Sequence, residues 1–187
     1  MTKDTMKKNA LFITYSNFKD HELIYPYYRV IGAGFKATVV GDKKDGKNRI
    51  YGTHGCNMPC DVLISEFAKN TDEYFNEYDL LIIPGGVDNT EYLRMVPEVQ
   101  EFVRRWDQAG KCLSIICHSP QVIISANMAQ GRTMSGFYCI KHDIINAGAT
   151  YVDQPVVVDG NLISSPHYDH MGPWMEETLK VYEKING

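Results

Sequence analysis

The stretch Ile115-Ile116-Cys117-His118-Ser119-Pro120 is the part of the sequence that decides the fold. It closes a continuous apolar run, Cys112 to Ile116, which is typical of a strand buried on both faces of a parallel sheet. Pro120 to Met128 follows almost at once and favours a helix. The sequence therefore predicts a strand and a helix joined by a sharp turn, with Cys117 exposed in a strained conformation at that turn.

A second apolar run of the same kind, Leu80 to Ile83, ends in Pro84-Gly85-Gly86. Strands and helices alternate along the rest of the chain, which predicts an α/β fold with a mostly parallel sheet and helices on both faces. In such sheets reactive groups lie beyond the carboxyl ends of the strands, so we expect the glycine pair and Cys117 to be neighbours. The other predicted elements are strands at 10–15 and 35–40, helices at 21–31, 97–108, 140–147 and 171–185, and a hairpin of 156–158 with 162–164; 41–48 is typical of a surface loop, and 57–68 fits either a strand or a helix.

The composition is that of an ordinary globular protein, with 44% hydrophobic and 22% charged residues. Its 187 residues suit one domain, 10–187, preceded by a polar segment, 1–9, that we expect to be flexible and too polar for a secretory signal. A net charge of −4 indicates no nucleic-acid surface, and no apolar run approaches the roughly 20 residues that span a bilayer. The odd set of five cysteines lacks a disulfide spacing and favours a reducing, cytoplasmic location.

Cys117 is a candidate nucleophile, because the helix that starts at Pro120 directs its positive dipole end at this position and favours the thiolate. The alternative is a buried core cysteine, as most free cysteines are. His118 is the nearest candidate base, or else serves only through its backbone N–H. Gly85 and Gly86 allow backbone N–H groups to approach an oxyanion, although a glycine pair after a strand also forms ordinary tight turns.

Several spaced motifs make the chain similar to a known family. It resembles the PfpI-type intracellular cysteine peptidases, in the superfamily of the parkinsonism-associated deglycase, chaperone-like glyoxalases and isocyanide hydratases, which share a class I glutamine amidotransferase-like fold. The similarity covers nearly the whole chain from Ala10 onward. The similar stretches are Phe18 to Tyr27, Ile83 to Gly86, Ile116 to Gln121, Ile140 to Ala149 and Val156 to Ser165.

The resemblance implies a flavodoxin-like three-layer sandwich that forms a homodimer or a larger homo-oligomer. It implies that Cys117 is the nucleophile, that a buried Glu22 hydrogen-bonds its sulfur, and that the N–H groups of Gly86 and His118 form the oxyanion hole. A carboxyl beside a thiolate must be neutral or well paired, because adjacent negative charges repel. In peptidase-like members a carboxylate of a neighbouring subunit orients the histidine, and Glu91 occupies that place here; a solvated glutamate at the start of a helix is the alternative.

Three departures from the family pattern concern the substrate more than the nucleophile. Ser119 replaces the usual glycine after Cys-His, and Phe137, with Tyr138 beside it, stands where many members have Tyr or His. Ser165 is followed by Pro166-His167-Tyr168-Asp169-His170 rather than by arginine. We expect Phe137, Tyr138, His167 and His170 to belong to the substrate-binding side of the pocket.

Metal, nucleotide and interface signals are weaker. His54, Cys56 and Cys60, with Cys139 and His142, are loosely spaced for zinc, and His167 with His170 fits a polar loop as well as a ligand pair. Nucleotide fingerprints are absent, so no cofactor is predicted. Tyr25, Tyr27 and Tyr28 favour an oligomer interface next to Glu22, or packing within the monomer.

The pattern favours a cysteine-dependent enzyme acting on small reactive carbonyl compounds, as a glutathione-independent glyoxalase or deglycase. An intracellular peptidase or another cysteine hydrolase or hydratase needs the same nucleophile and oxyanion site, so this alternative stays open. A third hypothesis is a redox sensor or stress chaperone in which Cys117 is oxidised to a sulfinic acid.

Overall fold

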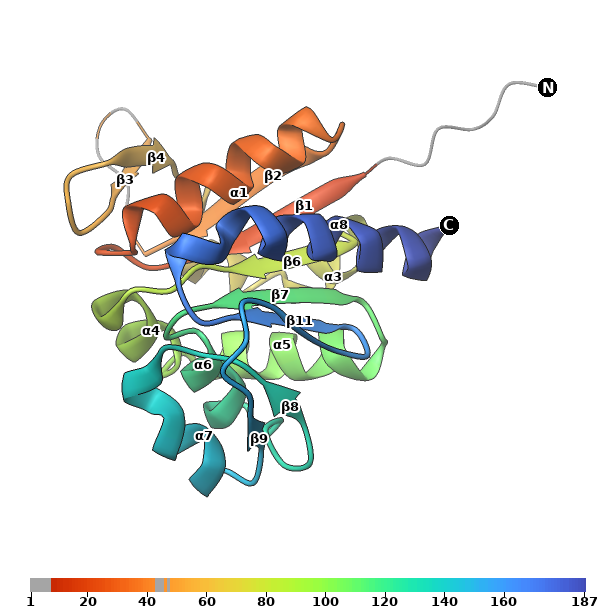
Figure 1. The fold of residues 1–187 in the computed structure, drawn as a ribbon. Helices are drawn as coiled ribbons and strands as arrows, with labels where there is room; N and C mark the ends of the chain where they lie inside the picture. Colours follow the sequence, from red (N-terminus) through yellow and green to blue (C-terminus); the bar gives the residue numbers. More distant parts are fainter. Residues whose placement is uncertain (1–7, 43–45, 47) are drawn as a thin grey trace.

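The central element of the fold is a sheet of mostly parallel strands (Figure 1). The structure is a computed structural model that describes residues 8–42, 46 and 48–187. Within those residues the sheet has seven strands, in the order β10 (Val157–Asp159), β11 (Leu162–Ser165), β7 (Cys112–Ile116), β6 (Leu80–Ile83), β1 (Asn9–Ile13), β2 (Lys36–Gly41) and β5 (Val62–Leu63). Every neighbouring pair is parallel except β10 with β11, which form the predicted hairpin.

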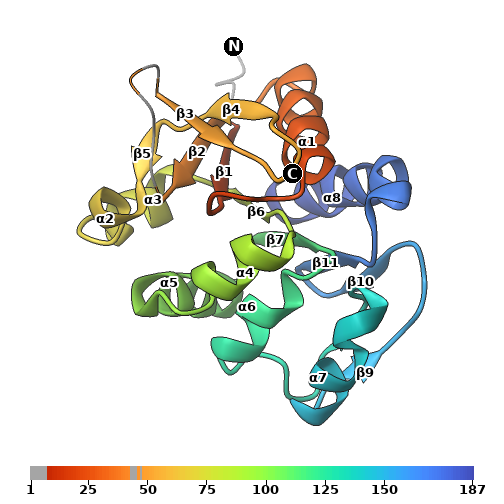
Figure 2. The ribbon, with the colours of Figure 1, turned by 90° about the vertical axis from the view of Figure 1, so that its left-hand side faces the viewer.

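Helices cover both faces of the sheet, as predicted (Figures 1 and 2). Helices α1 (Asp20–Gly32) and α8 (Met171–Asn186) lie together on one face, where Leu23 and Trp174 are fully buried in one apolar cluster. The opposite face carries α5 (Pro97–Gln108), whose Phe102 and Trp106 are fully buried in a second cluster. The remaining helices are α2 (Ile64–Phe67), α3 (Thr71–Glu77), α4 (Val87–Leu93), α6 (Pro120–Ser125) and α7 (Lys141–Asn146). This is the flavodoxin-like three-layer arrangement.

The register of β6 against β7 determines where the site forms. Ile83 lies opposite Ile115, so the segment Pro84-Gly85-Gly86 leaves β6 beside the turn that contains Cys117. Both strands are buried at every position, which explains their uninterrupted apolar sequences. The predicted meeting of the two strand ends is confirmed.

The structure also contains elements that the sequence patterns did not indicate. The ambiguous stretch 57–68 divides into β4 (Asn57–Pro59), β5 and α2, and β4 pairs with β3 (Arg49–Tyr51). A small parallel pair, β8 (Thr133–Met134) with β9 (Thr150–Tyr151), flanks α7, and 3₁₀ turns occupy Tyr138–Ile140 and Tyr168–His170. Helix α6 is shorter than predicted, since Asn127 has a φ of 56° and the chain turns away there.

The chain ends and cysteines bear on three further expectations. Of the segment expected to be flexible, residues 1–7 lie outside the described residues, whereas Asn9 is already the first residue of β1. Positions 43–45 and 47 of the expected surface loop also lie outside them. All five cysteines carry free thiols. Across the described ranges, none of the helices has the length and apolar character needed to cross a membrane.

Candidate active site

The turn after β7 places Cys117 in a strained backbone conformation. Its φ is 63°, a region that non-glycine residues seldom occupy. The N–H of Cys117 donates to the carbonyl oxygen of Ser165 at 2.9 Å, and its own carbonyl accepts from the N–H of Phe137 at 2.8 Å. Ser119 tightens the turn, because its Oγ accepts from the N–H of Ile116 at 2.7 Å. The serine therefore acts on the backbone of the turn, and its fully buried side chain does not line the pocket.

Glycine is required at positions 85 and 86 for different steric reasons. A Cβ at position 85 would lie 2.5 Å from Oε2 of Glu22 and 2.6 Å from Cβ of Cys117, so any larger residue would separate these two groups. Gly86 has a φ of 106°, and a Cβ there would lie 2.7 Å from the backbone nitrogen of Lys19. The pair therefore permits a close approach between α1, β6 and the cysteine turn.

Glu22 lies beneath Cys117 at the start of α1 and is fully buried. Its Oε2 accepts from the N–H of Gly85 at 2.9 Å, whereas Oε1 forms no hydrogen bond of ordinary geometry with the described residues. Burial raises the pKa of Glu22 to about 7, and the interactions with Cys117, the Gly85 N–H and the Lys19 charge offset part of that rise. The carboxyl therefore exchanges its proton near neutral pH, next to the thiol.

Burial also raises the pKa of the Cys117 thiol, and the neighbouring Glu22 charge raises it further. The N–H groups of Gly86 and His118 hydrogen-bond towards the sulfur and lower its pKa, but they do not outweigh these two causes. Desolvation and the adjacent carboxylate therefore oppose the thiolate that the start of α6 was expected to favour at Cys117. The same two N–H groups point to the place where an oxyanion would form beside the sulfur.

The His118 ring lies within hydrogen-bond distance of the Cys117 thiol. Its Nδ1 lies 3.2 Å from Sγ of Cys117. Burial lowers the pKa of His118, and the Glu91 charge partly opposes this effect. The imidazole is therefore neutral at pH 7, and in the tautomer with the proton on Nε2 its Nδ1 can accept the thiol proton.

Glu91 lies on α4 and acts on His118 of the same chain through its charge alone. Its carboxylate is half exposed and pairs with Arg94 at 3.5 Å. Among the described residues no hydrogen bond joins Glu91 to the imidazole. The contact expected across a subunit boundary stays a prediction.

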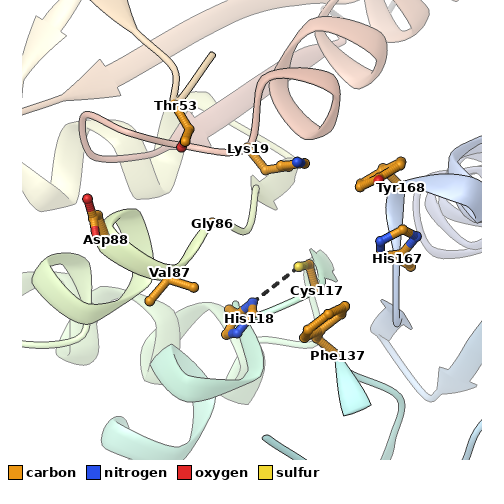
Figure 3. Close-up of a pocket in the computed structure, with 10 residues that line it drawn as sticks. All are labelled: Lys19, Thr53, Gly86, Val87, Asp88, Cys117, His118, Phe137, His167 and Tyr168. Atoms are coloured by element: carbon orange, nitrogen blue, oxygen red, sulfur yellow. Dashed lines mark hydrogen bonds between the residues drawn. The ribbon is translucent and has the colours of Figure 1, made fainter. Parts of the chain in front are cut away.

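A cavity of about 430 Å³ opens above Cys117 (Figure 3). Phe137 forms one side. The centre of its ring lies 5.0 Å from the centre of the His118 ring and 5.7 Å from the centre of the His167 ring. The remaining side chains and backbone that line the cavity come from four other segments of the chain: Lys19, Thr53, Gly86, Val87, Asp88 and Tyr168. Aromatic rings, one lysine and one carboxylate thus line the cavity.

Comparison with known proteins identifies the family. Residues 8–181 match the DJ-1/PfpI family. The chain belongs to this family. Deglycase PfpI of Pyrococcus furiosus is 37% identical over 171 residues, which are 91% of this chain and 97% of that protein. Deglycase PH1704 of Pyrococcus horikoshii is also 37% identical, over 92% of this chain and 98% of its own.

Solved structures of DJ-1/PfpI proteins share the fold. A two-domain protein of Anabaena variabilis, with DJ-1/ThiJ/PfpI-like and ferritin-like domains, aligns with a TM-score of 0.84 at 30% identity. The alignment covers 93% of this chain and 48% of that one, so this chain corresponds to about half of that protein. Schizosaccharomyces pombe DJ-1 aligns with a TM-score of 0.82 at 20% identity, over 96% of each chain.

Within this DJ-1/PfpI domain, the expected substrate-side residues divide between two cavities. Phe137 and His167 line the cavity above Cys117 and also a second one of about 490 Å³. Tyr138 and His170 belong only to the second, and Tyr138 is largely exposed. The two cavities adjoin, so Tyr138 and His170 lie farther from the sulfur than the sequence suggested.

Sequence reasoning missed Lys19, Thr53, Asp88 and Tyr168 as lining residues. Lys19 carried the best available signal, because it precedes the Asp20-His21-Glu22 motif that places Glu22 under the thiol. Thr53 comes from a turn, Asp88 from the first turn of α4 and Tyr168 from a 3₁₀ turn, and only the folded chain brings these segments to the cavity.

The loosely spaced histidines and cysteines do not form a metal centre. Across the part of the chain that is described, no three His, Cys, Asp or Glu side chains gather closely enough to hold an ion. The turn at His54 and Cys56 instead serves the fold, since both N–H groups donate to the carboxylate of Asp20, at 2.9 and 2.8 Å. Burial raises the pKa of Asp20, but these two donors outweigh it and the pKa is lowered.

Proposed function

We propose that this DJ-1/PfpI protein is a cysteine-dependent enzyme that acts on small reactive carbonyl compounds, as a glutathione-independent glyoxalase or deglycase. The observation that carries the proposal is the arrangement around Cys117: a thiol under strain, a neutral imidazole at 3.2 Å and a buried carboxyl that titrates near pH 7. The deglycase names of relatives at 37% identity support the same class of reaction. The cavity size supports small substrates.

The proposed reaction begins when Sγ of Cys117 bonds to the aldehyde carbon of a 2-oxo aldehyde. The thiol proton passes to Nδ1 of His118, and the carbonyl oxygen becomes an oxyanion facing the N–H groups of Gly86 and His118. Protonation of that oxygen gives a hemithioacetal. A base then moves the proton from the aldehyde carbon to the neighbouring carbon, the hemithioacetal hydroxyl proton passes to the ketone oxygen, and the product is the thioester of a 2-hydroxy acid.

Water completes the proposed cycle. It attacks the thioester carbon, the carbon–sulfur bond breaks, and the 2-hydroxy acid leaves while the thiol regains its proton. The net change adds one water molecule to the 2-oxo aldehyde and consumes no oxidant or reductant. A neutral imidazole and a carboxyl near its titration point suit this shuttling of single protons.

The test is incubation of the purified protein with methylglyoxal and, in parallel, with casein and an isocyanide. We expect loss of methylglyoxal and formation of lactate with the native protein, and neither with Cys117→Ser. Cys112→Ala is the matched control, because Cys112 is equally buried but lies at the other end of β7. Cleavage of casein without turnover of methylglyoxal would replace the proposal with a peptidase. Turnover of the isocyanide alone would replace it with a hydratase.

We also propose that the protein works as a homo-oligomer. On α1, Tyr27 packs against Phe12, with ring centres 5.9 Å apart, so part of the tyrosine cluster is internal. Tyr28 and Ile31 are exposed on the same helix, by 60% and 43%. Light scattering after size-exclusion chromatography measures the assembly, and a monomer at micromolar concentration would contradict this proposal.

A further inference from the structure

Lys19 is the cation in the wall of the cavity above Cys117. Figure 3 shows its ammonium group directed towards Tyr168 and His167, on the same side of the cavity as the sulfur. Asp88, the carboxylate among the described lining residues, lies at the other end. The charges of the cavity are therefore separated along its length.

The backbone of Lys19 packs against the Gly85-Gly86 segment. Its N–H donates to the carbonyl oxygen of Gly85 at 3.1 Å, and it packs where a Cβ of Gly86 would otherwise stand. The residue immediately precedes α1, which begins at Asp20 and carries Glu22 in its first turn. The position of the ammonium is thus tied to the same loops that position the thiol and the oxyanion donors.

The ammonium of Lys19 contacts two aromatic side chains. Nζ lies 3.2 Å from Nε2 of His54 and 4.9 Å from the centre of the Tyr168 ring. Among the described residues no carboxylate lies within ion-pair distance of it. By contrast, Oδ2 of Asp88 already accepts from Nδ2 of Asn17 at 3.0 Å. Lys19 thus forms no ion pair with the described carboxylates, whereas Asp88 already accepts a hydrogen bond from Asn17.

The long-range charge of Lys19 reaches the reacting groups, since it lowers the pKa of the buried Glu22. A ligand bound above Cys117 would feel this charge in a half-enclosed space, where attraction is stronger than in bulk water. We propose that Lys19 is a specificity-determining residue that selects carbonyl compounds bearing an anionic group, a carboxylate or a phosphate. The inference deepens the proposed function and rests on it only for the carbonyl part.

The arrangement also orients such a substrate. An anionic group next to Lys19 places the rest of the molecule over the sulfur, between the Phe137 ring and the N–H groups of Gly86 and His118. The reverse orientation would bring the anion towards Asp88, where like charges repel. The lysine ammonium is a compact point charge, so it can bind either a carboxylate or a phosphate.

The first experiment needs no enzymatic activity. Iodoacetate and iodoacetamide alkylate the same sulfur and differ by one negative charge, and mass spectrometry reads their rates separately at Cys117 and at the exposed Cys139. We expect the iodoacetate-to-iodoacetamide rate ratio at Cys117, relative to Cys139, to fall about tenfold in Lys19→Met, which corresponds to 1.4 kcal/mol. It should fall further in Lys19→Glu and recover in Lys19→Arg.

The second experiment uses a matched pair of substrates, phenylglyoxal and 4-carboxyphenylglyoxal, with hydroxypyruvaldehyde phosphate as the phosphate-bearing probe. In Lys19→Met, kcat/KM for the two anionic compounds should fall about tenfold more than for phenylglyoxal. Using the ratio removes any effect of Lys19 on Glu22, because that effect is common to all substrates. Whichever anionic compound loses more identifies the preferred anion.

Lys36→Met is the control, because Lys36 is an exposed lysine that pairs with Glu77 far from the cavity. Unchanged ratios in Lys19→Met and Lys19→Glu, in both experiments, would overturn the inference. Selective alkylation by iodoacetate without turnover of any 2-oxo aldehyde would leave the anion preference standing and reject the proposed function. Turnover of phenylglyoxal with no charge preference would support the proposed function and reject the anion preference.

Discussion

The two ends of strand β7 carry the same residue in different surroundings. Cys112, at its first position, is fully buried, and its Sγ lies 3.7 Å from the carbonyl oxygen of Thr178. Burial alone raises its pKa to about 12. Cys117, just past the last position, is also buried, but it lies among Glu22, His118 and the N–H of Gly86.

The comparison shows that burial alone does not distinguish the surroundings of the two thiols. Both sulfurs are desolvated, and in both burial is the largest cause of a raised pKa. What differs is the presence of groups that can take the proton and stabilise a negative charge, and these gather only at the carboxyl end of the strand. In the proposed reaction, the thiol of Cys117 loses its proton to His118 as it attacks.

The largest expected effect on activity comes from replacing each of the two cysteines in turn. Cys117→Ser should lower kcat/KM for methylglyoxal by at least about a thousandfold, since the nucleophile is lost. Cys112→Ala should change it by less than about twofold, while the small cavity it leaves costs roughly 1–2 kcal/mol of unfolding free energy. Steady-state kinetics and urea denaturation measure the two effects. Comparable losses of activity in both variants would contradict a special role for Cys117 in the reaction.

The second prediction tests the close packing of Gly85 against Glu22 and Cys117. Gly85→Ala places a Cβ against Glu22 and Cys117, so we expect a loss of about 2–3 kcal/mol in unfolding free energy and of most activity. Gly32→Ala is the control, because no atom lies within 4 Å of its added Cβ and alanine is the better helix former. Equal stabilities of the two variants, in denaturant titrations, would contradict the close-contact argument.

Glu22→Gln tests the buried carboxyl through its pH dependence. Because burial raises the folded-state pKa of Glu22 from 4.5 to about 7, the folded protein binds the proton more tightly than the unfolded chain. This contribution is fully present below pH 4.5 and is lost as the pH rises through 7, by about 3 kcal/mol in unfolding free energy. In Glu22→Gln that decline should disappear.

The same variant should alkylate faster at Cys117, because removing the Glu22 charge removes one cause of the raised thiol pKa. Glu98→Gln, an exposed carboxylate on α5, is the control for both measurements. A stability profile between pH 4.5 and 7 that is identical in Glu22→Gln and the native protein would exclude Glu22 as the titrating group.

The smallest expected effect concerns Glu91. Its charge raises the pKa of His118 from the surface of α4, so Glu91→Gln should lower that pKa further. Activity should change by less than about twofold, since the carboxylate is half exposed and paired with Arg94. NMR titration of the His118 imidazole measures the shift. A loss near a hundredfold would instead indicate direct contact with an imidazole across a subunit boundary.

Much of the fold was predictable because its strongest signals are local. The apolar runs 80–83 and 112–116 indicated central parallel strands, and the stripe of Val99, Phe102 and Trp106 indicated a helix; both are confirmed. Helix α4 was missed, since it is short and starts directly after Gly86, where the chain has a positive φ. The small β8–β9 pair was missed because two-residue strands show no period.

Two features of the site are already evident in the sequence: a cysteine that follows a buried strand at a sharp turn, and a glycine pair at the end of the neighbouring strand. These features depend on steric and apolar patterns within a few residues. Only the tertiary structure decided the direction of the thiol pKa, because desolvation and the Glu22 charge arise from segments far apart in the chain. It also placed Lys19 above the sulfur and moved Tyr138 and His170 to the adjoining cavity. Electrostatic effects depend on distance in space, and the linear sequence does not contain those distances.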